Sequence, residues 1–176
     1  MKVNLLNGSV VVLLASLGSV TQATAANNEV TFVGSVLDTA CTVTVNDGKS
    51  TVDLGGTLKS DLAAQGDTGA PKSFSILLSG CPTDGPTAAY IKFSGETDGN
   101  NSYFKNTATS SAATNVAVLI KQGETTVEAN DGNDAITLPE AGGDVNVDYT
   151  AQLVATATGA TKGAVSSTLT YNVSYQ

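Results

Sequence analysis

Residues 28–37, NEVTFVGSVL, have the pattern of an extended β-strand. Side chains alternate between the two faces of an extended strand, and here apolar side chains occur on both faces. One face would carry Val30, Phe32, Gly34 and Val36, and the other Thr31, Val33, Ser35 and Leu37. An apolar strand edge of this kind aggregates unless it is covered. We therefore expect this segment to insert, as a missing strand, into the sandwich of another copy of the protein.

The residues before this stretch predict export. Met1 and Lys2 are followed by an apolar run, Val10–Leu17, that only Ser16 interrupts, and then by the small residues Ala23-Thr24-Ala25. This order is typical of a secretory signal peptide that is cleaved after Ala25. A membrane anchor is the alternative, but the run is much shorter than the roughly 20 residues that span a bilayer. We expect residues 1–25 to be removed, which leaves 151 of the 176 residues.

The charge of the chain argues against a nucleic-acid partner. The sequence has 8 basic and 16 acidic residues, and removing Lys2 leaves 7 and 16, a formal charge of −9. Phosphate binding needs clustered positive charge. All the basic residues are Lys, so the bidentate grip that Arg gives on phosphate or carboxylate is missing as well.

The side chains that most enzymes and zinc sites need are also missing. The sequence has no His, so Ser-His-Asp and Cys-His catalysis and the common zinc sites lack a required member. Carboxylate chemistry stays open in principle, but acidic residues gather in turn-like stretches such as Glu96–Gly99 and Asp131–Asp134, where solvated turns are the simpler interpretation. Asp131–Asp134 is similar to a calcium loop without the later bidentate Glu. We expect no enzymatic activity, no cofactor and no metal.

Cys41 and Cys81 are the only cysteines. In an exported chain they are expected to pair. The loop-entropy estimate for their separation of 40 residues credits the bond with roughly 4 kcal/mol. A reactive thiol is the alternative, but nothing basic enough to lower a thiol pKa stands beside either cysteine.

Short alternating runs between turn clusters predict a β-sandwich of seven to nine strands. Residues Thr57–Lys72 are predicted to form a loop, with Lys59–Gln65 as a candidate for one helical turn. The predicted strands are Thr42–Val45, Ser50–Leu54, Phe74–Cys81, Ala88–Phe93, Ser102–Asn106, Asn115–Lys121, Thr125–Ala129, Ala135–Leu138, Asp144–Ala157 and a final strand from about Ala164 to Tyr175.

Several motifs, in this order and spacing, resemble the pilin subunits of chaperone-usher fimbriae, closest to the major subunit of type 1 pili. The resemblance covers the whole expected mature chain. The motifs are Val30–Val36 followed by Ala40-Cys41, Ser79-Gly80-Cys81-Pro82, Ala113–Val118, Tyr171–Gln176, a glycine fourteenth from the C-terminus (Gly163) and a penultimate tyrosine (Tyr175).

The resemblance implies an all-β, incomplete immunoglobulin-like sandwich that lacks its last strand and is completed by donor-strand exchange. It divides the chain into a signal peptide (1–25), a donor-strand extension (26–38) and a pilin domain (39–176). Val30, Phe32, Gly34 and Val36 would be the donor residues; a simple bulge is the alternative reading of Gly34. The chain ends at Gln176, directly after its last predicted strand, so we expect no later segment to fill the groove. The groove edge and chaperone contact would be formed by Gly163, Leu169, Tyr171, Val173, Tyr175 and Gln176.

The function that follows from the resemblance is a structural subunit of an extracellular fimbrium that supports cell adhesion. The implied partners are identical or homologous pilin subunits, a periplasmic chaperone, an outer-membrane usher and a fimbrial tip adhesin or adaptor. A minor tip or adaptor subunit is one alternative, and a secreted carbohydrate-binding sandwich is another. Adhesins of such fimbriae carry a separate lectin domain, for which the expected mature chain has no room. A sandwich enzyme such as a copper-zinc dismutase is excluded by the lack of His.

Overall fold

The computed structural model describes residues 40–99, 102–131 and 135–176. These residues belong to one structural unit of the chain. The expected signal peptide and the expected donor residues Val30, Phe32, Gly34 and Val36 lie outside the described residues.

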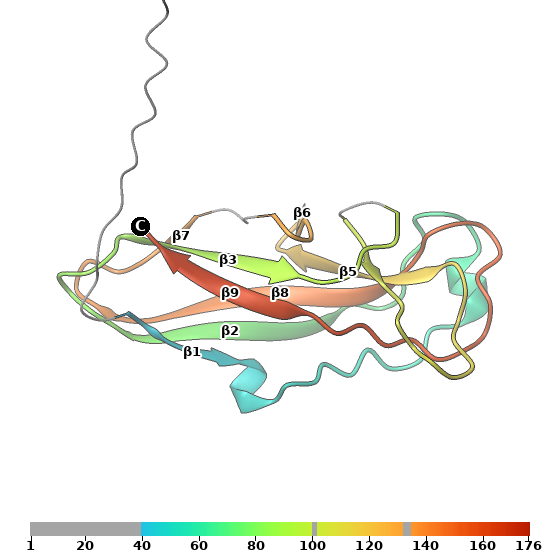
Figure 1. Ribbon diagram of the computed structural model, residues 1–176, viewed down its shortest axis with the longest axis horizontal. Coiled ribbons are helices and arrows are strands. Elements are labelled where there is room, and N and C mark those ends of the chain that lie inside the picture. Colours follow the sequence, from blue (N-terminus) through green and yellow to red (C-terminus); the bar gives the residue numbers. More distant parts are fainter. Residues whose placement is uncertain (1–39, 100–101, 132–134) are drawn as a thin grey trace, which may run out of the picture. The chain divides into compact units, whose positions relative to one another are not determined.

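The described residues form nine strands and two short 3-10 helices, and they include no α-helix (Figure 1). The 3-10 helices are η1 (Asn46–Gly48) and η2 (Lys59–Leu62). The strands are β1 (Thr42–Val45), β2 (Lys72–Cys81), β3 (Ala88–Ser94), β4 (Phe104–Lys105), β5 (Val116–Gln122), β6 (Thr125–Thr126), β7 (Ile136–Thr137), β8 (Gly143–Ala155) and β9 (Thr170–Tyr175).

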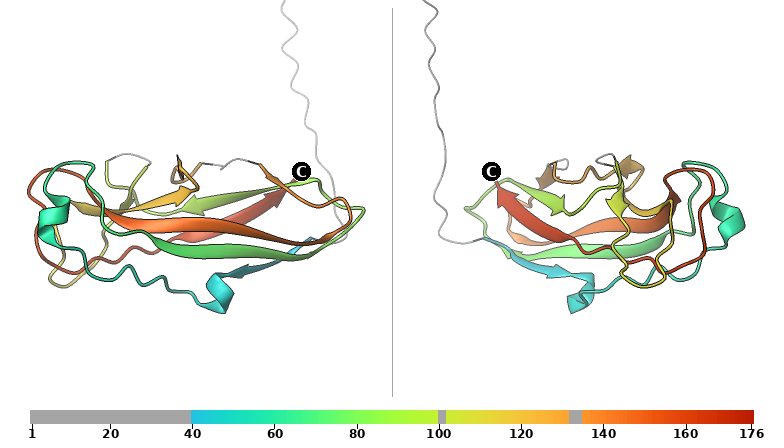
Figure 2. Two further views of the ribbon diagram at one scale, coloured as in Figure 1. Left: turned by 180° about the vertical axis from the view of Figure 1, so that it is seen from behind. Right: turned by 45° about the vertical axis from the view of Figure 1, so that its right-hand side comes forward.

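The strands form two antiparallel sheets. The larger sheet has the order β1-β2-β8-β5-β4, with β6 paired to β5, and the smaller sheet has the order β7-β3-β9. In Figure 2 the long ribbons of β2 and β8 lie in one layer, and β3 and β9 lie in the other. In the described part of the chain β1 pairs only with β2, and β9 pairs only with β3, so both are edge strands.

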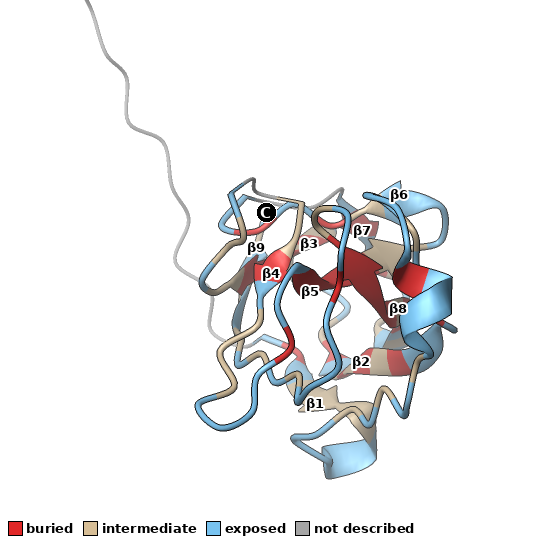
Figure 3. Ribbon diagram, turned by 90° about the vertical axis from the view of Figure 1, so that its right-hand side faces the viewer, coloured by how far each residue is buried: buried red, intermediate tan, exposed pale blue. Residues whose placement is uncertain are grey.

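Side chains that alternate along the strands fill the space between the sheets. On β2, Ile76 and Leu78 are fully buried, and on β3, Ile91 is fully buried as well. Aromatic rings from both sheets meet at the centre: the rings of Phe74 and Tyr149 stack at 5.3 Å, and the ring of Phe93 meets Tyr149 edge-on at 5.2 Å. Figure 3 shows buried residues gathered along β5 and β8.

The strand prediction Thr42–Val45 is confirmed as β1, and the predicted final strand is too long. That strand was expected to begin near Ala164, but β9 begins at Thr170. The reason lies in its partner, because β3 ends at Ser94, which faces Thr170 in the ladder.

The predicted strand Ser50–Leu54 is wrong. Side chains instead bond the local backbone: the Asn46 amide donates to the carbonyl of Thr51 at 3.1 Å, and the Asp53 carboxylate accepts from the amide of Gly55 at 2.9 Å. Asn and Asp side chains compete in this way with regular backbone pairing. The predicted helical turn is present as η2, although it ends at Leu62.

Candidate functional site

The two edge strands β1 and β9 border a strip of apolar side chains that the sandwich does not cover. We call this strip the open margin. Its side chains pack against the core and yet all are only partly buried. They are Val43 and Val45 of β1, Val52 and Leu54 after it, Val165 and Leu169 before β9, and Val173 and Tyr175 of β9.

The inward-facing side chains of β9 are more exposed than those of its partner β3. Tyr171 lies opposite Phe93 in the ladder, and the next inward-facing pair is Val173 and Ile91. Phe93 is 4% exposed, whereas Tyr171 is 43% exposed. β3 has a strand on each side, but β9 has one on only one side among the described residues. A further strand along β9 would therefore bury apolar surface and also pair its exposed backbone edge.

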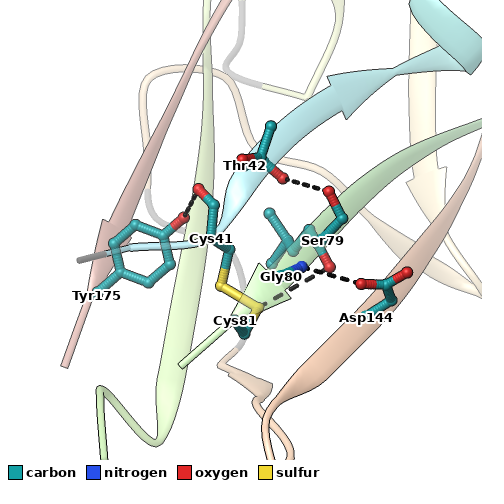
Figure 4. The surroundings of a disulfide bond; sticks show 8 residues. Cys41, Thr42, Ser79, Gly80, Cys81, Asp144 and Tyr175 are labelled. Atoms are coloured by element: carbon teal, nitrogen blue, oxygen red, sulfur yellow. Dashed lines mark hydrogen bonds between the residues drawn. A yellow bond between two sulfur atoms is a disulfide. The ribbon is translucent and has the colours of Figure 1, made fainter. Parts of the chain in front are cut away.

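The disulfide lies at one end of the open margin (Figure 4). It joins Cys41, directly before β1, to Cys81, the last residue of β2, and so confirms the predicted pairing. Gly80 has a φ of +62°, which glycine adopts at little cost, and its amide donates to the Asp144 carboxylate at 2.9 Å. The β2–β8 register shifts between Leu78 and Cys81, so this irregularity lies directly before the disulfide.

Tyr175 links the two edges of the margin at the same end. Its hydroxyl donates a hydrogen bond to the carbonyl of Cys41 at 3.3 Å, as Figure 4 shows. Burial raises the pKa of the Tyr175 hydroxyl above its ordinary value. The penultimate tyrosine therefore closes one end of the margin instead of only pointing into it.

Gly163 stands where the chain turns into the segment that leads to β9. A Cβ atom at this position would meet the backbone of the neighbouring loop: the amide of Ala113, the carbonyl oxygen of Ser111 at 2.5 Å and the carbonyl carbon of Ala112 at 2.6 Å. Ala164, the next residue, bridges to Ala112. Only glycine allows the two backbones to come this close.

We expect Gly163→Ala to destabilise the chain by about 1–3 kcal/mol, because the loop backbone has to move away from the added methyl group. The measurement is the midpoint of urea unfolding. Gly56→Ala is the matched control, since a Cβ at Gly56 meets nothing within 4 Å, and it should change stability by less than about 0.5 kcal/mol. Equal midpoints for the two variants would contradict the steric role of Gly163.

Two acidic residues of the turn 96–99 make local contacts. Glu96 forms an ion pair with Lys105 at 3.0 Å, and the amide of Asp98 donates to the carbonyl of Tyr103. The residues described here contain no cluster of three or more His, Cys, Asp or Glu side chains that would hold a metal. The calcium-like stretch Asp131–Asp134 lies partly outside the described residues.

An apolar hollow of about 430 Å³ lies beside η2, and its lining holds no carboxylate, thiol or imidazole. It is lined by Lys59, Ser60, Leu62, Ala63, Gly159 and Ala160.

In the part of the chain that the structure describes, no helix is long and apolar enough to cross a membrane.

The resemblance led us to expect Leu169, Tyr171, Val173 and Tyr175 at the groove edge, and all four lie on or directly before β9. Val43, Val45, Val52 and Leu54, on the opposite side of the margin, were expected to lie in strands and were not assigned to the groove. The sequence could have indicated them, because Val43 and Val45, and likewise Val52 and Leu54, are apolar residues two positions apart among polar neighbours.

The sequence model of the family described as Fimbrial protein matches residues 30–176, which is more than half of the chain. The chain belongs to the fimbrial protein family. The resemblance to chaperone-usher fimbrial subunits and the all-β, immunoglobulin-like fold expected from the sequence are thereby confirmed.

Relatives of this fimbrial protein include a probable major subunit and a minor subunit of fimbriae. The probable major fimbrial subunit LpfA of Escherichia coli O157:H7 is 31% identical, with 90% of this chain and 89% of the relative covered. The minor fimbrial subunit HifD of Haemophilus influenzae is 33% identical, with 86% of this chain and 75% of the relative covered. A solved chaperone-usher pilus structure is 25% identical with a TM-score of 0.65, and the match covers 87% of this fimbrial protein and 98% of that chain.

Proposed function

We propose that this fimbrial protein is a structural subunit that builds a fimbrial rod by strand donation. Residues 28–37 of one copy fill the open margin of the next copy, so that each subunit donates one strand and accepts one. The observation that carries the proposal is the margin itself, where inward-facing residues of β9 remain partly exposed although their partners on β3 are buried.

The donor segment matches the margin in period and chemistry. Val30, Phe32 and Val36 recur at every second or fourth residue, and the side chains of β9 that face the margin also recur at every second residue. Full burial of these three side chains would contribute on the order of 5–9 kcal/mol. Backbone hydrogen bonds along an added strand would contribute about 1 kcal/mol each, while ordering the segment opposes both terms. Gly34 brings no side chain, which leaves one position of the margin unfilled.

The joint between copies is heterologous, because the donor segment and the margin are different surfaces of the same chain. Repetition of such a joint produces an open, head-to-tail polymer. Before assembly the margin would be exposed, so it needs temporary cover. We assign that cover to a periplasmic chaperone, and the exchange to an outer-membrane usher, with a tip adhesin or adaptor at the end of the extracellular fimbrium. This role is structural and not catalytic.

A minor tip or adaptor subunit is the second candidate, because a minor subunit is among the relatives. Electron microscopy of fimbriae sheared from cells with and without the gene distinguishes the two. We expect rods to disappear without the gene and to return when it is restored. Rods of normal length and number in its absence would contradict the rod-forming role and favour the minor subunit.

A further inference from the structure

The side chain of Asn106 is bonded to the backbone at four points. Its amide nitrogen donates to the carbonyls of Ala113, at 2.9 Å, and Ala164, at 3.0 Å. Its amide oxygen accepts from the amides of Ala108, at 3.1 Å, and Ser166, at 3.0 Å. Two donors and two acceptor positions are all that an Asn amide offers, so this group is fully used. It joins the loop 106–113 to the residues that lead into β9.

These leading residues, 164–169, are called here the terminal segment, and they have no pairing with β3. β3 ends at Ser94, opposite Thr170. The loop 106–113 takes the place of a strand partner: the amide of Thr107 donates to Ser166 at 2.7 Å, and the amide of Ala164 donates to Ser111 at 2.8 Å. The side chain of Asn106 therefore reinforces a contact that otherwise consists of a few backbone hydrogen bonds.

The terminal segment continues the alternation of β9. Val165, Ser167 and Leu169 are half-buried, whereas the residues between them are exposed. With Tyr171, Val173 and Tyr175, which face the same way from β9, the acceptor side has six alternate positions. β9 alone supplies only three of them. The donor stretch 28–37 has five positions on its Val30 face, at residues 28, 30, 32, 34 and 36, so it needs more than β9 to lie against.

We propose that Asn106 is a positioning residue that gives the acceptor edge its full length. By holding the terminal segment in line with β9, it extends the edge from three to six inward positions and so admits the whole donor stretch. The inference rests on the proposed function, since an edge of this length matters only if a strand is taken up. Without Asn106, residues 164–169 would be held only by backbone hydrogen bonds to the loop 106–113, and the part of the donor stretch that lies against them would be less firmly paired.

Hydrogen exchange on the exported chain tests the positioning itself, without an added donor peptide. In Asn106→Ala, the amides of Ala164 and Ser166 should exchange at least tenfold faster, while amides of β5 and β8 keep their protection. Asn115→Gly is the matched control, because it removes hydrogen bonds from a side-chain amide to Thr158 and Gly159 at 3.0 and 3.4 Å but does not touch the terminal segment. Unchanged exchange at Ala164 and Ser166 would overturn the inference.

Uptake of a labelled peptide tests the consequence. The exported chain is refolded with a fluorescent peptide of residues 28–37, or with peptides shortened by four residues at either end. Asn106→Ala should release the full peptide at least tenfold faster than the unchanged chain. One of the two shortened peptides lacks the end that lies against residues 164–169. The variant and the unchanged chain should release that peptide at the same rate, and they should still differ for the other. A merely general loss of stability would instead weaken all three peptides alike.

The outcomes separate the inference from the function on which it rests. Equal release by the variant and the unchanged chain would overturn the role of Asn106 and leave strand uptake intact. Failure of the unchanged chain to bind any peptide would contradict strand uptake, and the role of Asn106 with it. If Asn106→Ala does not fold, Asn106→Asp is used instead. It replaces the amide nitrogen with an oxygen that faces the carbonyls of Ala113 and Ala164 and cannot donate to them at pH 7. Release of the full peptide should therefore be faster. Protonation of the carboxyl group at low pH gives it a donor, and release should slow again.

Discussion

A chain that carries its own donor strand is expected to be monomeric and to melt far above the chain without one. The variant lacks residues 26–37 at its start and carries residues 28–37 after Gln176 on a short glycine-rich linker. Burial of Val30, Phe32 and Val36 at about 5–9 kcal/mol corresponds to a rise in melting temperature of at least roughly 10–20 °C. Light scattering and thermal unfolding, compared with the chain that lacks the segment altogether, measure both effects.

The gain has a kinetic part as well. Joining the strand to its own acceptor replaces a bimolecular step with an intramolecular one, at an effective concentration in the millimolar range. Loss of the strand then requires exposure of all the buried apolar surface at once, so unfolding should be slow.

A single substitution serves as the control for this variant. Phe32→Asp in the appended copy would place an unpaired charge in the apolar margin, and most of the thermal gain should vanish. Ser35→Asp puts the same charge on the opposite face and should preserve most of the gain. If the appended segment with Phe32 intact changed neither the oligomeric state nor the melting temperature, strand donation would have to be abandoned.

Removal of Tyr175 and Gln176 is expected to abolish recovery of a chaperone complex from the periplasm. The backbone of Gln176 exchanges hydrogen bonds with Ala88, donating at 2.9 Å and accepting at 3.0 Å, and accepts from Thr87 at 2.9 Å. The deletion removes these bonds and the link from Tyr175 to Cys41. It also moves the terminal carboxylate, through which we expect the chaperone to hold the edge.

Co-purification from periplasmic extracts gives the measurement for this deletion. Gln176→Ala is the matched control, because it retains the backbone hydrogen bonds and the position of the terminal carboxylate. We expect this control to yield normal amounts of the complex. Undiminished recovery with the deletion would show that the chaperone grips another edge.

Alternation of apolar and polar residues predicted a strand correctly where a neighbouring strand pairs with it along its whole length. Phe74, Ile76 and Leu78 alternate into Cys81, and β2 has neighbours on both sides, so the pattern and the strand agree. The disulfide was predictable for a different reason, because two cysteines in an exported chain have one way to pair within it.

What the sequence could not predict depends on contacts between distant residues. Val165 and Leu169 alternate as well as Val173 does, but only residues from Thr170 onward have β3 beside them. Nothing local distinguishes these two cases. The role of Asn106 is hidden for the same reason, because two of its four partners lie about 60 residues away in the chain.

The disulfide described above also determines how tension would pass through a fibre made of such subunits. A pull on the chain ahead of Ala40 reaches Cys41 first, and the covalent bond carries the load directly to Cys81 at the end of β2. From β2 the load spreads into its long ladder with β8. The part of the chain that leads from Thr42 to the start of β2, including the short strand β1, is bypassed and would not be peeled from the sandwich by the force. Reduction of the bond would send the same load through β1, whose ladder with β2 is only four residue pairs long.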